Sequence, residues 1–83
     1  MCMVLNASNI NGSWVLYCSE HDGEFLGAKT LKIINNDNKV YETRDFLVDK
    51  TKPCFSKGGN PLVMVKNHIP NEFLEKGNSV YLD

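Results

Sequence analysis

The sequence predicts a small, mainly β protein with a single domain. Eighty-three residues leave room for one thin core and for no second domain. Turn-forming dipeptides recur at short intervals, and runs of β-branched and aromatic residues lie between them. An apolar fraction of 42% with 23% charged residues is typical of a folded chain and not of a disordered one. Together these observations favour a strongly bent antiparallel sheet.

The first predicted strand, residues 13–20, lies between two turns. Asparagine and glycine at residues 9–12 tolerate the positive φ angles of hairpin loops, which predicts a turn there. A second turn of the Asp-Gly type is expected at residues 21–24. His21 and the acidic residues around it are therefore expected at an exposed, polar hairpin tip.

Residues 25–34 form the next predicted strand. Leu31 and Ile33 alternate there with polar residues, which is the period of a half-buried strand. Asparagine and aspartate at residues 35–38 predict a third turn.

The second half of the chain predicts three more strands. Residues 39–49 are expected as one strand, followed by a long loop over residues 50–61. Residues 62–65 are wholly apolar, which predicts a short strand at the centre of the core. Residues 79–82 are expected to close the chain as the last strand.

One helical turn is predicted near residues 70–77, because Asn71 suits a helix start and Gly77 a helix stop. Five to six short strands with one such turn predict a small antiparallel β-barrel or roll, for which SH3-like and OB-like barrels are the templates. An α+β fold with a longer helix over residues 66–77 is the alternative.

The charge distribution suggests where a partner binds. The net charge is only −1, yet residues 50–71 contain no acidic residue, while the flanking segments are acidic. The candidate binding residues in this segment are Lys50, Lys52, Phe55, Lys57, Lys66 and His68. The lysines could follow a phosphate backbone while the aromatic ring stacks on a base. The same residues could instead contact an acidic protein or form a solvated surface.

A metal site and a catalytic site are both disfavoured by residue spacing. Cys18 and His21 have the spacing of metal ligands, but Cys54 and His68, which would complete a zinc site, are far apart in sequence. We therefore predict no metal and no cofactor.

A metal-independent ribonuclease would need histidine, a cationic side chain and tyrosine in one groove. His68, Arg44, Lys66 and Tyr41 are candidates, but Arg44 is the chain's single arginine. This is the least favoured hypothesis, and we predict that the protein is not an enzyme.

A cytoplasmic location is expected. The chain shows no signal-peptide pattern and no apolar run long enough for a membrane span, so no membrane partner is predicted. Cys2, Cys18 and Cys54 are odd in number and widely spaced, which favours reduced thiols.

The function hypothesis combines these observations. Frequent asparagine and lysine, which have A/T-rich codons, favour a bacteriophage or mobile-element origin and therefore a host cytoplasm. We expect a small accessory or inhibitor protein that docks on a host protein or on a protein–RNA complex. The alternative is direct binding of RNA or single-stranded DNA by residues 50–68. A homodimer is also compatible with so thin a core.

Overall fold

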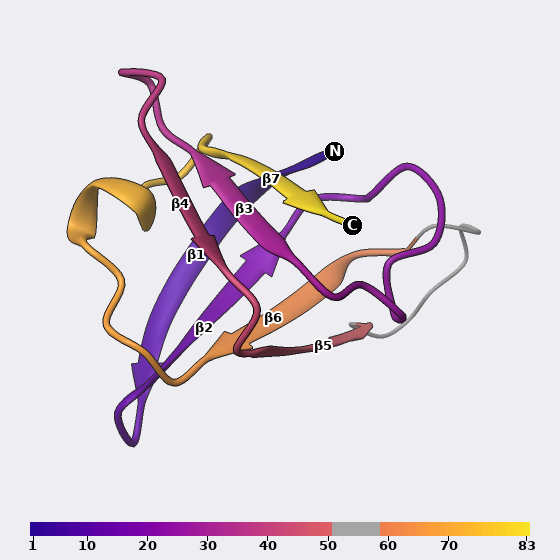
Figure 1. Ribbon diagram of the computed structural model, residues 1–83, viewed down its shortest axis with the longest axis horizontal. Helices are drawn as coiled ribbons and strands as arrows, with labels where there is room; N and C mark the ends of the chain where they lie inside the picture. The colour runs from indigo at the N-terminus through magenta and orange to yellow at the C-terminus, as the bar shows by residue number, and fades with distance from the viewer. Residues whose placement is uncertain (51–58) are drawn as a thin grey trace.

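The computed structural model describes residues 1–50 and 59–83, and these fold into seven antiparallel strands (Figure 1). The strands are β1 (Cys2–Ile10), β2 (Ser13–Cys18), β3 (Leu31–Ile34), β4 (Val40–Thr43), β5 (Phe46–Lys50), β6 (Pro61–Val65) and β7 (Ser79–Leu82). They form one sheet in the order β4-β3-β7-β1-β2-β6-β5. The predicted mainly β class is confirmed. The edge strands β4 and β5 are not paired with each other, so the sheet is open and closure into an SH3-like or OB-like barrel is not confirmed.

Strand β1 divides the sheet into two halves because it bends. Cys2 and Met3 pair with β7, whereas the residues from Val4 onward pair with β2. The register shifts between Val4 and Asn6, and such a bulge bends a strand and increases its twist. We call β4, β3 and β7 the first half-sheet, and β2, β6 and β5 the second. Figure 1 shows that the strands of the two halves cross at an angle.

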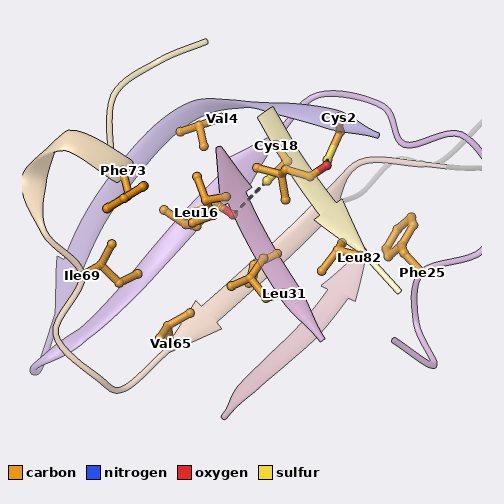
Figure 2. Packing of buried hydrophobic residues seen from close by; sticks show 13 residues of the cluster. Cys2, Val4, Leu16, Cys18, Phe25, Leu31, Val65, Ile69, Phe73 and Leu82 are labelled. Carbon is orange, nitrogen blue, oxygen red and sulfur yellow. Dashed lines mark hydrogen bonds between the residues drawn. The ribbon is translucent and has the colours of Figure 1, made fainter. Parts of the chain in front are cut away.

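The two half-sheets enclose one hydrophobic core. Leu16 and Val63 of the second half-sheet and Leu31, Ile33 and Val80 of the first are fully buried in the same cluster. Figure 2 shows Leu16 and Leu31 in the middle of this cluster, with Phe73 near one end and Phe25 near the other. The inward positions of both half-sheets follow the period of two that a pleated strand imposes.

The two edge strands are consecutive in the chain. Only Arg44 and Asp45 separate the end of β4 from the start of β5, although these strands lie at opposite edges of the sheet. The Oγ1 atom of Thr43 accepts a hydrogen bond of 3.1 Å from the N–H of Asp45, which stabilises the corner locally. The predicted single strand over residues 39–49 is therefore two strands.

Two other details differ from prediction, and the predicted helical turn is confirmed. Strand β1 was not expected, because its second half is polar and only Cys2 and Val4 within it are buried. Strand β3 begins only at Leu31, because residues 26 and 27 form a turn in which the N–H of Ala28 donates to the carbonyl of Phe25. The helical turn η1 (Asn71–Phe73) is a three-residue 3₁₀ turn within the predicted range, so the alternative of a longer helix is wrong.

Candidate protein-binding surface

The described lysines of the predicted basic segment do not lie together. Lys50 ends β5 opposite Pro61, whereas Lys66 follows Val65 at the other end of the same ladder. Lys50 is half-buried, and its Nζ lies 5.8 Å from the centroid of the Phe25 ring, within the range of a cation–π contact. Lys52, Phe55 and Lys57 lie outside the described residues. The part of the segment that can be described therefore does not form one basic patch.

Lys66 and His68 are exposed where β6 ends, beside the corner between β4 and β5. The Nδ2 of Asn67 lies 3.5 Å from the Oδ2 of Asp45, which is a long hydrogen bond across this junction. Arg44 is exposed at the same corner. The corner thus carries the basic residues Arg44 and Lys66 with Asp45 between the strands.

Tyr41, the tyrosine of the ribonuclease hypothesis, lies on β4, the strand that leads into this corner. Its ring packs against Phe73 with ring centroids 5.7 Å apart, beside the hydrophobic core. Burial is the main reason why the pKa of its phenol is raised. The carboxylate of Asp45 also raises this pKa, so the phenol lies near the corner between β4 and β5 while its ring packs beside the core.

The outer surface of the second half-sheet is apolar. In one row across the strands, Leu47 of β5 pairs with Met64 of β6, and Met64 pairs with Val15 of β2. In the next row on the same face, Leu62 lies between Asp49 and Tyr17. We call the outer surface formed by Val15, Tyr17, Leu47, Leu62 and Met64 the apolar face.

Leu47 is the most exposed large apolar residue among those described, with 65% of its surface accessible to solvent. Met64 beside it is 37% exposed, whereas Val15 is only 4% exposed beneath its neighbours. Val15 is also not part of the interior cluster. The apolar face is thus a packed surface layer of its own, separated from the core by the sheet.

Two hollows adjoin Leu47 and Met64. One has a volume of about 150 Å³, and Asp45, Phe46 and Lys66 complete its lining. The other has a volume of about 320 Å³, and Val48, Asp49 and Leu62 complete its lining. Both hollows share Leu47 and Met64, so the two side chains stand between two places where a partner's side chains could insert.

A third depression lies at the end of the core near Trp14. It has a volume of about 370 Å³ and is lined by Leu5, Asn6, Ala7, Trp14, Asn71, Leu74, Glu75 and Lys76. Trp14 is partly buried and packs against the core, so its position is explained by folding. This depression is wide and shallow, and its rim mixes amide, acidic and basic groups without a charge preference.

The cysteine and histidine residues of the zinc hypothesis are not assembled. Cys18 and His21 are buried near the Pro61 end of β6, whereas His68 is exposed beyond its Val65 end. Cys54 lies outside the described residues. Within residues 1–50 and 59–83, no group of three or more metal-ligating side chains could hold an ion.

Cys18 and His21 are better explained as parts of the interior. The Cys2 thiol is a hydrogen-bonding neighbour of Cys18, and this contact, together with burial, raises the pKa of Cys18. The His21 ring contacts the edge of the Phe25 ring at a centroid distance of 5.5 Å and is only 6% exposed. The prediction that His21 lies at an exposed hairpin tip is therefore wrong.

The apolar face was missed at the sequence level, although a pattern for it exists. Within residues 46–50, Leu47 and Asp49 occupy alternate positions and therefore share one side of the strand. Because Leu47 lies between Phe46 and Val48, the three residues look like one buried apolar run. Only its pairing opposite the exposed Met64 of β6 shows that Leu47 points outward.

Comparisons with protein-family models, with curated proteins and with solved structures give no match to this chain. No helix in the described part of the chain is long and apolar enough to cross a membrane.

Proposed function

We propose that this protein is a small, non-enzymatic binding module that docks on another protein through its apolar face. The observation that carries the proposal is the 65% exposure of Leu47 beside Met64, on an edge strand and between two hollows. Contiguous exposed apolar surface on a small protein is typical of an interaction site. Single exposed apolar residues are common, but here they occupy neighbouring positions on three paired strands.

The energetics suit such an interface. Burying a leucine side chain that is exposed in the free protein contributes about 1.5–3 kcal/mol. Leu47 is therefore a candidate for the central contact, and side chains of the partner would fill the two hollows beside it. Lys66 and Asp49 lie at the rims of these hollows, where charges set orientation and association rate more than affinity.

The kind of partner follows from size and composition. A thin domain of 83 residues offers a binding surface more readily than a deep catalytic cleft. We place the protein among accessory or inhibitor proteins of bacteriophage or mobile-element origin that act on a host protein or a protein–RNA complex. A barrel-like closure of the SH3 or OB type belongs to the same proposal, because the corner at Arg44 and Asp45 joins the two sheet edges directly.

Direct binding of RNA or single-stranded DNA has less support. Lys50 and Lys66 lie at opposite ends of the β5–β6 ladder, and Lys50 is engaged with Phe25. Binding to phosphates would weaken steeply with salt, whereas binding through an apolar face would weaken little. Salt dependence therefore separates the two functions.

The experiment is a capture from host lysate with three forms of the tagged protein. Wild type, Leu47→Ser and the control Val40→Ser are compared at low and high salt. Val40 is 53% exposed but lies on the first half-sheet, so it matches Leu47 in exposure without touching the apolar face. We expect one stoichiometric protein with wild type and with Val40→Ser, at both salt concentrations, and its loss with Leu47→Ser.

Two results would contradict the proposal. The first is equal capture of the same protein by Leu47→Ser and by wild type, since the apolar face would then not be the contact. The second is co-purification of nucleic acid that is lost at high salt or in Lys66→Ala, which would establish the nucleic-acid function instead.

A further inference from the structure

The larger of the two hollows on the apolar face contains a single charged group. Its described lining residues are apolar apart from one carboxylate, and they are Leu47, Val48, Asp49, Leu62 and Met64. The smaller hollow shares Leu47 and Met64, but both Asp45 and Lys66 line it, so its charges offset each other. The two hollows therefore differ in charge, although the same two side chains separate them.

Within the described part of the chain, no cation pairs with the carboxylate of Asp49. Neither of the two ion pairs described in residues 1–50 and 59–83 includes it. The Nζ of Lys50, the next residue, lies over the ring of Phe25, which belongs to the interior cluster on the other side of the sheet. The Oδ1 of Asp49 accepts the N–H of Lys50 at 2.7 Å. This bond orients the carboxylate, and its other lone pairs remain for a ligand.

We propose that the larger hollow binds a basic side chain of the docking partner, with its aliphatic stem against Leu47 and Met64 and its cation at Asp49. The inference rests on the proposed function, because it assigns one contact within the apolar face. Arginine and lysine bury their stems on apolar surface while their charged ends stay at the rim. A neutral side chain in this hollow would cover the carboxylate without replacing its lost hydration, and an acidic one would be repelled.

Arginine suits this site better than lysine. Its guanidinium group is more weakly hydrated than an ammonium group, so less free energy is lost when it approaches an apolar wall. It also donates two parallel N–H bonds to a carboxylate, which fixes the orientation of the bound side chain. The orienting bond from the N–H of Lys50 to Asp49 prepares the carboxylate for such a contact.

The smaller hollow suits an uncharged side chain of the same partner segment. Its volume is about 150 Å³, and an apolar cavity of about that size holds a benzene molecule. The hollows lie on either side of the paired Leu47 and Met64, along a ladder that rises about 3.3 Å per residue. An extended partner would therefore fill them with side chains two positions apart, one apolar and one basic.

The test uses two synthetic tripeptides with blocked ends and the full-length protein with labelled methyl groups. One peptide is leucine-glycine-arginine, and the other carries citrulline, which has the shape of arginine without its charge. Nuclear magnetic resonance titrations follow the methyl signals of Leu47, Leu62 and Met64. Val40, exposed on the first half-sheet, supplies a reference methyl signal that should not move.

Asp49→Asn and Asp37→Asn are the matched variants, because each removes one exposed carboxylate. Asp49→Asn keeps an Oδ1 atom for the N–H of Lys50, so its fold should be preserved. Asp37 lies in the turn after β3, away from the apolar face. We expect wild type and Asp37→Asn to bind the arginine peptide about fivefold more tightly than the citrulline peptide, as an exposed ion pair allows. Asp49→Asn should bind both peptides equally, and salt should reduce the preference of wild type.

Equal affinity of wild type for the two peptides would overturn the proposal and leave docking through the apolar face intact. An unchanged preference for arginine in Asp49→Asn would also overturn it, as would the absence of saturable shifts at Leu47 and Met64 up to the solubility limit of the peptides. The proposed function fails by a different result, namely equal capture of the same lysate protein by Leu47→Ser and by wild type. The two failures are therefore distinguishable, and the comparison of peptides on wild type needs no variant.

Discussion

The two half-sheets share one core but differ on their outer surfaces. On the first half-sheet, Lys32 of β3 and Glu42 of β4 face each other, with Nζ and Oε1 3.8 Å apart. At the corresponding place on the second half-sheet, Leu47 faces Met64. Stability resides in the interior that both halves build, whereas the outer surfaces are free to differ. The apolar one is therefore the better candidate for function.

The largest expected loss in the free energy of unfolding comes from substitutions in the hydrophobic core. Leu16 and Leu31 come from opposite half-sheets and are both fully buried in one cluster. Replacing either with alanine removes packed methyl groups and leaves a cavity, so each variant should lose about 2–5 kcal/mol of the free energy of unfolding. Urea denaturation followed by circular dichroism measures the loss.

The same experiment tests whether the halves are one unit. Trp14 lies on the second half-sheet, so its fluorescence reports on that half, while far-ultraviolet circular dichroism reports on all strands. The two transitions should coincide in wild type and in both variants. If Leu31→Ala shifts only the circular dichroism transition, the two half-sheets unfold separately and the premise of a shared core fails.

The next largest loss in the free energy of unfolding is expected in the turn that follows β3 of the first half-sheet. Asn35 is only 7% exposed, and its Oδ1 accepts the N–H groups of Asp37 and Lys39 at 2.9 and 3.0 Å. Its Nδ2 donates to the Oε2 of Glu72 at 3.0 Å, which ties the turn after β3 to η1. Asn35→Ala removes the acceptor of two part-buried backbone N–H groups and should cost about 1–3 kcal/mol in the free energy of unfolding.

Neighbouring Asn36 is the control for this turn, because it is exposed. Asn36→Ala should change the free energy of unfolding by less than about 0.5 kcal/mol. Equal effects of the two alanine variants would show that the side-chain hydrogen bonds of Asn35 do not hold the turn.

A smaller loss in the free energy of unfolding is expected at alkaline pH. It comes from the thiol of Cys18 on β2, which contacts Cys2 on β1. The pKa of Cys18 is raised by its contact with Cys2 and by burial, so the folded protein keeps this thiol proton where the unfolded chain loses it. Its contribution is complete below about pH 8.5, the pKa of an unfolded thiol, and is lost as the pH rises further. The decline should approach about 1.4 kcal/mol per pH unit from this group.

Urea denaturation in the presence of a reductant, between pH 7 and 10, measures this slope. Cys18→Ala should flatten it relative to wild type, although this variant also removes the contact with Cys18 that lowers the pKa of Cys2. Identical slopes in the two proteins would mean that Cys18 does not hold its proton differently in the folded state.

The fold was predictable where the spacing of apolar residues and the turn-forming residues indicate the same strands. Leu31 and Ile33 alternate as a half-buried strand should, and Gly12 has the positive φ that its predicted turn requires. Strand β1 escaped prediction because its Asn6 to Ile10 half is held by pairing with β2 and not by a buried face. Tertiary pairing of this kind leaves no periodic pattern in the sequence.

The site was less predictable than the fold. Local charge drew attention to Lys50 and Lys66, but strand pairing separates them by the length of β6. Leu47 carries the candidate function and has no charge or motif to mark it. Whether an apolar residue of a strand faces the core or the solvent depends on which neighbours the sheet provides, and that information is not local.

The sharpest test of the comparison places glutamine on each of the two outer surfaces, where it should change the free energy of unfolding very little. Glu42→Gln breaks the ion pair with Lys32, whose side chains are 55% and 40% exposed, so solvent screening keeps the loss below about 0.5 kcal/mol. Leu47→Gln changes an exposed position and should alter stability equally little. Affinity for the captured partner, measured by calorimetry, should fall only in Leu47→Gln. If Glu42→Gln weakens binding as much as Leu47→Gln does, the charged surface takes part in docking and the two half-sheets do not divide stability and function in this way.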